Sequence, residues 1–482
     1  MKQVKMVTSS QNIMWISINI LYAMVLYLIT PLFSDIQKER QIVIVCWFGI
    51  FTTLLTILMI KNVRKRFDFY TILISLTFFF MFGQHLIYMF GIYPKDMIIL
   101  TNRVSAKALY NTGILICYSI IALNVGYLFN TGSVTTGIIS NSNIENCERT
   151  RISMYKSGLF FFCLSLIPTA IELLTNIYLT FTVGYGERMM NAAYKKSGIT
   201  NITGIVSGFM IPSLFALFIS RKPKQKWPII ALIIYMILYM LSGSRIHILI
   251  ILVGILYIQN RYFSKLNFKK IFLYIISIVL IMSLFSIIST ARKNVGNGSD
   301  NFTTIKSSIE NSVENNPVIS ALSEAGYTFE ATATVIDNCP NNEPYNYGIS
   351  YLSGIIYILP NGFTGNYFNT IAKSTDDTFK GYINSYGSGI GSSYIAEAYW
   401  NFGYFSLLLM IVFGFLLGKL CTKLNESIEY NNYATMYIVI YCLVIISFYV
   451  RSDTRTFYRN LVWFGLPLLF LYKQKEKRLY EK

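Results

Sequence analysis

The sequence predicts an all-α polytopic integral membrane protein, with about twelve transmembrane helices and a long external loop between the ninth and the tenth. Of its 482 residues, 54% are hydrophobic and only 13% are charged, whereas soluble domains carry about 25% charged residues. The mean hydropathy is +0.48, and apolar runs long enough to cross a bilayer core of about 30 Å recur along the chain. We therefore interpret residues 1–482 as a single transmembrane domain.

Each expected helix corresponds to one apolar run. The first run lacks a small-residue cleavage site, so we interpret it as a retained helix rather than a signal peptide. Residues 227–260 are too long for one span and short for two, which predicts that residues 242–245 lie recessed below the outer surface. The last run is also short, and it predicts the same for Arg459. The expected helices are 12–33, 41–60, 70–92, 108–130, 157–183, 201–220, 227–242, 246–258, 271–290, 394–418, 433–450 and 458–472.

The placement of Lys and Arg predicts that both termini are cytoplasmic. Residues 61–69, 221–226, 259–270 and the tail after 472 are dense in basic side chains, and they fall on one side of this topology. On that side lie 24 of the 41 basic residues, as the positive-inside rule requires of cytoplasmic loops. The net charge of +18 therefore needs no nucleic-acid partner.

The longest connection, residues 291–392, is external on this topology. Its first part is polar, and its second part is rich in Gly, Tyr and Asn. It contains one apolar piece, residues 349–360, which is too short to span a bilayer. We expect a short re-entrant or surface helix there, ended by Pro360.

Several classes of chemistry are excluded by what the sequence lacks. It contains no GxxxxGK[ST], HExxH, DxD or CxxC motif, its seven cysteines are scattered, and it has only two histidines. We expect no metal and no cofactor. The only aspartate on the predicted cytoplasmic side is Asp68, so a nucleotide-sugar transferase site there is disfavoured. Any chemistry is expected on the external side, where nucleotide donors are not available.

Arginines concentrate at the predicted external junctions. Guanidinium groups bind phosphate oxygens through a bidentate fork and stay charged at any relevant pH. At a membrane boundary an arginine is costly unless it faces a polar cavity or an anion, so a shared diphosphate is expected. Interface anchoring, or pairing with Asp453 and Glu187, is the alternative. The candidates are Arg188, Arg245, Arg292 and the run Arg451, Arg455 and Arg459, which an extended helix would place on one face.

Three external carboxylates could accept a proton from a hydroxyl group: Glu397, Glu324 and Glu330. Glu397 is expected at the outer interface, near arginines that keep it ionised. We rank it first as a catalytic base, followed by Glu324, although a structural role remains open for each. Glu172, within the fifth expected helix, should face the bundle interior.

Four stretches carry a resemblance to a known family: LSGSRIHIL (241–249), STARKNVG (289–296), LSEAGYTFEATATVIDNCP with YNYGISYLSGIIYILP (322–360), and SSYIAEAYWNFGYFSLLL (392–409). Together with the long late loop and the external arginines, they resemble Wzy-type polymerases of O-antigen and capsular polysaccharide, in the oligosaccharide repeat-unit branch. The resemblance assigns Arg245 and Arg292 to the arginine motifs and Glu397 to the AEAYWNFG motif.

The resemblance implies a bacterial inner-membrane glycosyltransferase that needs no cofactor. Its donor and acceptor would be oligosaccharide repeat units linked to undecaprenyl diphosphate, joined on the outer side of the cytoplasmic membrane. Membrane lipid and a chain-length regulator are further partners to expect. An O-antigen-ligase-like transferase is the alternative enzyme, although the external loop has no clear counterpart of the ligase histidine. A flippase of lipid-linked oligosaccharides is the alternative from another class, but no internal repeat supports it.

Overall fold

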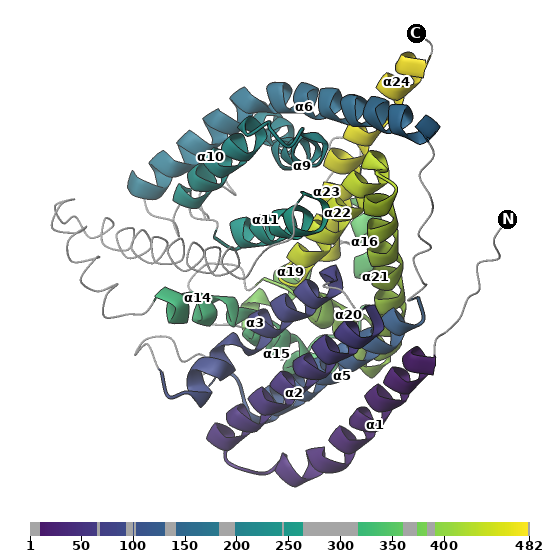
Figure 1. Ribbon diagram of the computed structural model, residues 1–482. Coiled ribbons are helices and arrows are strands. Elements are labelled where there is room, and N and C mark those ends of the chain that lie inside the picture. Colours follow the sequence, from purple (N-terminus) through teal and green to yellow (C-terminus); the bar gives the residue numbers. More distant parts are fainter. Residues whose placement is uncertain are drawn as a thin grey trace.

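The computed structural model describes residues 10–64, 68–92, 100, 103–130, 141–182, 198–242, 245–263, 317–359, 374–382 and 391–480. Over these residues the protein is entirely helical (Figure 1). The N-terminal half contains α1 (Ser10–Phe33), α2 (Lys38–Arg64), α3 (Phe69–Met89), α5 (Ala106–Leu128), α6 (Asn141–Thr182), α8 (Gly198–Ser207), α9 (Met210–Ser220), α10 (Trp227–Leu241), α11 (Arg245–Ile258) and the π-helical turn η1 (Gln259–Phe263). The C-terminal half contains α14 (Pro317–Ala325), α15 (Tyr327–Asn338), α16 (Ile349–Ile356), α19 (Thr375–Phe379), η2 (Lys380–Tyr382), α20 (Tyr394–Phe402), η3 (Gly403–Phe405), α21 (Ser406–Glu429), α22 (Tyr433–Tyr449), α23 (Thr454–Asn460), η4 (Leu461–Gly465) and α24 (Leu466–Tyr480).

Seven helical segments in the described ranges are long and apolar enough to cross a membrane. Three shorter apolar helices accompany them, at Trp227–Leu241, Ile250–Phe263 and Tyr433–Tyr449. The prediction of a polytopic, all-helical membrane protein is therefore confirmed. The count of about twelve spans stays a prediction, because the expected helix 271–290 lies outside the described residues.

The ends of the helices meet in two groups. In the first group, the Arg64 guanidinium at the end of α2 donates to the Thr422 hydroxyl near the end of α21 over 2.8 Å. Ser153, early in α6, donates to the backbone carbonyl of Tyr472 in α24 over 2.9 Å. These contacts join segments that the topology predicts to be cytoplasmic.

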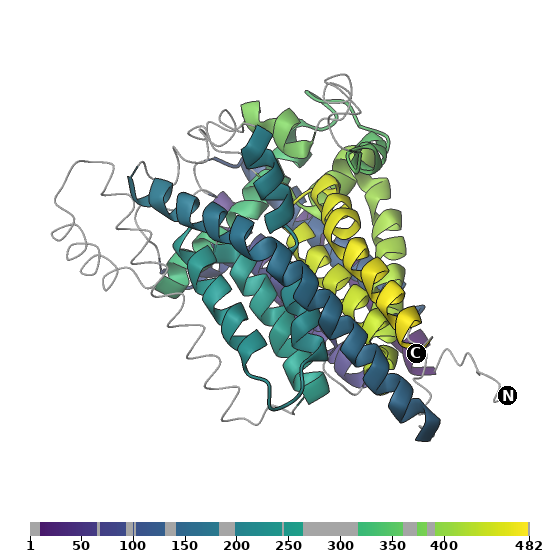
Figure 2. The same cartoon turned by 90° about the horizontal axis from the view of Figure 1, so that it is seen from above.

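The second group lies at the opposite end of the bundle. Here the Gln84 amide of α3 donates to the backbone carbonyl of Ser323 in α14 over 3.3 Å, and Arg103 faces Glu330 of α15 at 3.7 Å. Figure 2 shows α14 to α20, in green, away from the yellow end of α24. Segments predicted to be cytoplasmic thus contact one another at one end of the bundle, and segments predicted to be external contact one another at the other end. Which end faces the cytoplasm stays a prediction.

Glycines allow the central helices α5 and α21 to approach closely. A Cβ added at Gly414 would lie 2.1 Å from the Leu123 carbonyl oxygen, and one at Gly126 would lie 1.9 Å from the Ile411 carbonyl oxygen. Gly418, four residues after Gly414, completes a GxxxG pattern, which favours tight backbone packing between membrane helices. Helices α1, α2 and α15 pack on α5, and α20 and α22 pack on α21.

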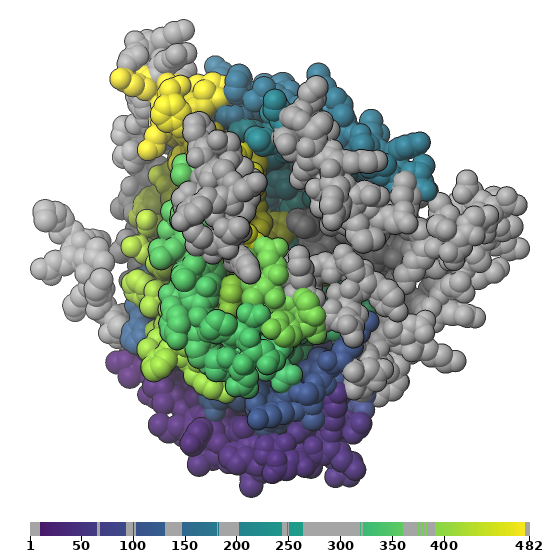
Figure 3. Space-filling view, turned by 180° about the vertical axis from the view of Figure 1, so that it is seen from behind, coloured from purple at the N-terminus to yellow at the C-terminus, as the bar shows by residue number. Residues whose placement is uncertain are grey.

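Helices of the predicted external loop pack directly on α3 rather than lying apart from the bundle. A Cβ at Gly83 would lie 2.4 Å from the Leu322 carbonyl oxygen, and one at Gly326 would lie 2.6 Å from the Gln84 backbone nitrogen. In Figure 3 the green segments lie on one face, between the purple N-terminal helices and the yellow C-terminal helix. A helix is present at Ile349–Ile356 as expected; Pro360 lies outside the described residues, and the relation of this helix to the membrane stays a prediction.

Four helices differ from the sequence-based expectation. The helix expected over 157–183 begins at Asn141, and the one expected over 201–220 is divided into α8 and α9. The helix expected over 394–418 is broken into α20 and α21 at Gly403, whose φ of 55° favours glycine. The last helix was expected to be short, but α23, η4 and α24 continue without interruption from Thr454 to Tyr480. The helix therefore begins four residues before the expected range 458–472, and the recessed position of Arg459 stays a prediction.

Candidate functional site

Glu397 lies at the centre of a buried hydrogen-bond network. Its side chain, in the first turn of α20, is only 2% exposed. One carboxylate oxygen, Oε1, accepts from the Ser350 hydroxyl of α16 over 2.8 Å. The other, Oε2, accepts from the Tyr449 hydroxyl over 2.8 Å, and from the backbone N–H and the hydroxyl of Thr454 over 2.9 and 2.8 Å. The network thus fastens α16, α20, α22 and α23 to one another.

This environment differs from the one that the sequence predicted for Glu397. We expected a carboxylate at the outer interface beside arginines, but in the described part of the chain its hydrogen-bond donors are hydroxyls and one backbone N–H. Such a carboxylate is stabilised by its donors. It has no accessible edge for an acceptor sugar, so the geometry favours a positioning role.

Arg455, on α23, is held in an ion-pair cluster. Its guanidinium contacts Asp377 at 3.1 Å and Asp453 at 3.3 Å, and it lies 4.8 Å above the centre of the Tyr357 ring. Burial would raise the pKa of the Asp377 carboxyl, but hydrogen bonds from Ser374 and Arg455 outweigh burial and lower that pKa. The cluster joins α19 to α23 beside the end of α16.

Arg459 lies one turn further along α23 and is exposed. Its guanidinium stacks 4.8 Å above the Trp463 ring, and it forms no ion pair within the described residues. The Trp463 indole donates to the Ile358 carbonyl over 2.6 Å, which fixes the ring beside the end of α16. The face of an aromatic ring attracts a guanidinium, and because Arg459 is exposed, its N–H donors are available to an anion.

The prediction that Arg451 shares one helical face with Arg455 and Arg459 is wrong. Helix α22 ends at Tyr449, and the backbone N–H of Arg451 bonds to Phe448 in a turn before α23. Asp453 then caps α23 by accepting from the Thr456 backbone N–H over 3.0 Å. Because the cap starts a new helix, only Arg455 and Arg459 are one turn apart on the same helix.

Glu324 and Glu330 lie on the neighbouring helices α14 and α15. Glu324 is partly exposed. Glu330 is buried, and burial raises the pKa of its carboxyl, although the nearby Arg103 opposes that shift. The structure therefore brings an accessible carboxylate and a buried one to the same end of the bundle, together with Arg103, which the sequence did not single out.

Three predicted diphosphate-binding arginines cannot be placed. Arg188 and Arg292 lie outside the described residues, and of Arg245 only the backbone, at the start of α11, is described. Ser350, Tyr449, Thr454 and Asp377 were missed by sequence reasoning. The start of α23 had a recognisable sequence signal, because an aspartate directly before TRTF is a typical helix N-cap.

Comparison with known families finds one that matches nearly the whole chain. The model of the O-antigen polysaccharide polymerase Wzy family matches residues 13–475. No curated protein and no solved structure matches. The family acts in the membrane on lipid-linked oligosaccharide repeat units, which fits the apolar helices and the exposed arginine described above. The match covers far more than half of the sequence, and the chain therefore belongs to the O-antigen polysaccharide polymerase Wzy family.

Proposed function

We propose that this polysaccharide polymerase transfers a growing glycan from undecaprenyl diphosphate onto one incoming lipid-linked repeat unit. The acceptor hydroxyl oxygen forms a bond to the anomeric carbon of the donor sugar, and the bond from that carbon to the diphosphate oxygen breaks. Undecaprenyl diphosphate leaves with the bonding electron pair, while the hydroxyl proton passes to a base. The reaction needs stabilisation of the diphosphate and a proton acceptor.

The observation that carries this proposal is the exposed guanidinium of Arg459, held on the Trp463 ring. We place the leaving diphosphate there, with Arg455 beside it; Arg188, Arg245, Arg292 and Arg451 are further candidates from the sequence. Preformed donors aimed at developing negative charge need no rearrangement during the reaction. The pairing of Arg455 with two carboxylates supports a role in orienting this site.

We propose that Glu324 takes the proton in preference to Glu397. Glu324 is partly exposed, whereas Glu397 is buried and already accepts four hydrogen bonds. A general base must come within hydrogen-bond distance of the hydroxyl it deprotonates. The ranking reached from the sequence is thus reversed in this proposal.

We further propose twelve spans, both termini in the cytoplasm and a place in the bacterial inner membrane, where a chain-length regulator could bind. Asn341→Cys lies at the predicted outer end and Lys224→Cys at the predicted inner end, and both side chains are exposed. An impermeant thiol reagent should label the first in intact spheroplasts, above the wild-type signal, and the second only after lysis. The reverse pattern would overturn the orientation.

The test of the diphosphate site is elongation of a lipid-linked repeat unit by purified protein in nanodiscs. Removing one donor to a developing oxyanion costs about 10²–10³-fold in rate, so we expect Arg459→Ala to lose activity on that scale. Arg459→Lys keeps the charge but not the planar fork, and it should restore only part of the rate. Lys224→Ala, a basic side chain at the other end of the bundle, is the matched control. Wild-type rates in both Arg459 variants would exclude this arginine from the site.

A further inference from the structure

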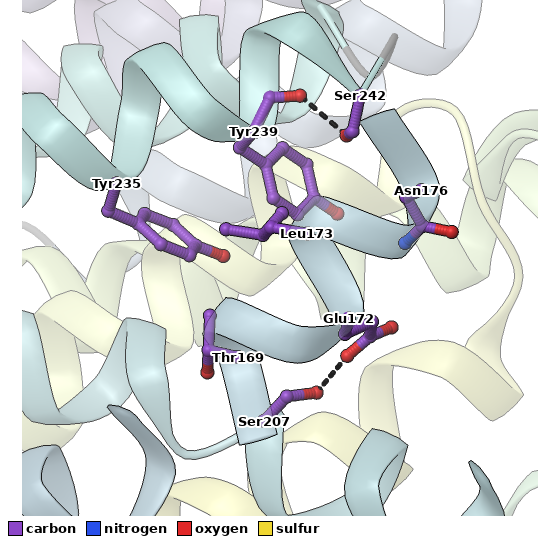
Figure 4. Close-up of a pocket in the computed structure, with 8 residues that line it drawn as sticks. All are labelled: Thr169, Glu172, Leu173, Asn176, Ser207, Tyr235, Tyr239 and Ser242. Carbon is purple, nitrogen blue, oxygen red and sulfur yellow. Dashed lines mark hydrogen bonds between the residues drawn. The ribbon is translucent and has the colours of Figure 1, made fainter. Parts of the chain in front are cut away.

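A polar cavity lies between α6, α8 and α10, and none of the residues that hold Glu397 lines it (Figure 4). Its volume is about 160 Å³, and every lining residue except Leu173 carries a polar side chain. The lining consists of Thr169, Glu172, Leu173, Asn176, Ser207, Tyr235, Tyr239 and Ser242. Such a lining is unusual between helices that are otherwise strongly apolar.

The cavity faces a polar stripe on α6. Thr169, Glu172 and Asn176 recur at i, i+3 and i+7, which places them on one face of the helix. Glu172 lies eight residues before Thr180, the end of the candidate membrane span Cys147–Thr180, which places it about 12 Å inside that span at 1.5 Å per residue. The remaining surface of this segment carries large exposed side chains: Ile167, Ile171, Leu174 and Tyr178. A carboxylate at this depth of a membrane span indicates a functional site.

The sequence predicted that Glu172 faces the bundle interior, and this prediction is wrong. Its side chain is exposed at the margin of the cavity and accepts a hydrogen bond from the Ser207 hydroxyl. The Thr169 hydroxyl is buried in the lining and has no hydrogen-bond partner among the described residues. Buried hydroxyl groups normally have a partner, so the cavity contains hydrogen-bonding capacity that the described residues leave unused.

The size and chemistry of the cavity select its ligand. An apolar cavity of about 150 Å³ accepts one benzene molecule, so this volume matches one six-membered ring. The lining offers a carboxylate, an amide and several hydroxyls, which together need a ligand that both donates and accepts hydrogen bonds. The hydroxyl groups of a sugar do both. The rings of Tyr235 and Tyr239, 5.5 Å apart, add an aromatic wall, which suits the apolar C–H face of a sugar.

We propose that this cavity binds one sugar ring of a membrane-anchored glycan, an inference that rests on the proposed function. The cavity lies near the C-terminal ends of α6 and α10. These two ends meet where the Thr180 hydroxyl donates to the Ser242 carbonyl over 3.3 Å. Glu172 is exposed at the margin of the cavity, so a lipid-linked sugar can enter there while its tail stays in the bilayer.

A photoreactive dodecyl β-glucoside with a diazirine in its alkyl chain, added to the protein in nanodiscs, tests the site. We expect crosslinks to peptides of α6 and α10. The double variant Thr169→Val/Glu172→Gln removes polar contacts with little change in volume and should label at least tenfold less. Tyr178→Phe, which alters an exposed residue on the same helix outside the cavity, is the matched control and should label as the wild type does.

Competition on the wild-type protein gives a second reading that does not depend on any variant. The lipid-linked repeat unit should suppress the crosslinks, whereas phosphatidylglycerol at the same mole fraction should not. Equal labelling of wild type and double variant, equal labelling by a dodecyl probe without the sugar, or suppression by phosphatidylglycerol would each overturn the proposal. Sugar-dependent labelling in a protein that elongates no glycan would overturn the proposed function and leave the sugar site intact.

Discussion

Two carboxylates on apolar helical segments, Glu397 and Glu172, have opposite surroundings. Glu397 is 2% exposed and receives four hydrogen bonds from three elements that are distant in sequence. Glu172 is exposed, accepts a hydrogen bond from Ser207, and borders the polar cavity. The sequence suggested the reverse, with Glu397 at an accessible interface and Glu172 in the interior.

The difference indicates which acid supports the fold and which can meet a substrate. A buried carboxylate whose partners all come from the protein holds those partners in place. An exposed carboxylate at the margin of a polar cavity is available to a ligand. Loss of Glu397 should therefore affect stability first, and loss of Glu172 should affect binding first.

The largest effect is expected for Glu397→Ala. The change removes the acceptor of the Ser350 hydroxyl and of the Thr454 backbone N–H, at a cost of about 1–3 kcal/mol for each unsatisfied group. The Tyr449 and Thr454 hydroxyls, 2.6 Å apart, keep each other as partners. We expect the free energy of unfolding to fall by about 3–5 kcal/mol, measured by titration with a denaturing detergent and tryptophan fluorescence. A wild-type unfolding curve for this variant would show that the network does not support the fold.

A smaller loss is expected for Ser350→Ala. This hydroxyl donates to Glu397 and accepts from the Asn401 amide over 2.7 Å, so its removal should cost about 1–3 kcal/mol. Ser353→Ala is the control, because Ser353 is also buried in α16 but donates only to the backbone carbonyl of Ser350. If both variants unfold alike, the contact to Glu397 contributes nothing beyond helix packing.

The smallest effect concerns Glu330, which is buried like Glu397 but faces the guanidinium of Arg103. Burial raises the pKa of its carboxyl above the ordinary value of 4.5, so the folded state binds this proton more tightly than the unfolded state does. The stabilisation from this proton is complete below pH 4.5 and is lost as the pH rises through the folded-state pKa. The wild type should lose thermal stability over that range relative to Glu330→Gln. Parallel pH profiles for the two proteins would contradict the assignment.

The sequence was a good guide to whatever depends on local composition. Long apolar runs predicted α1, α2, α3 and α5 within a few residues, because a membrane span needs continuous apolar side chains. The break at Gly403 was missed, since a glycine within an apolar run has many possible roles, and the ring of Tyr345 close to it comes from a distant segment.

The candidate site was less predictable for the same physical reason. The partners of Glu397 lie 47 to 57 residues away along the chain, and no spacing rule connects them. The Asp377 partner of Arg455 is 78 residues away. Arg455 and Arg459 were identified correctly as residues that lie on one helix, because that relation depends only on a spacing of four.

A side-by-side measurement of Glu172→Gln and Glu397→Gln tests the central claim most directly. For each purified variant, the KM and kcat for the lipid-linked repeat unit and the midpoint of thermal unfolding are determined. We predict that Glu172→Gln raises KM about tenfold with an unchanged midpoint, whereas Glu397→Gln lowers the midpoint and leaves KM unchanged in the folded fraction. A Glu397→Gln protein with the wild-type midpoint and a kcat reduced 10²–10⁴-fold, the usual contribution of a general base, would contradict this account and make Glu397 the catalytic base.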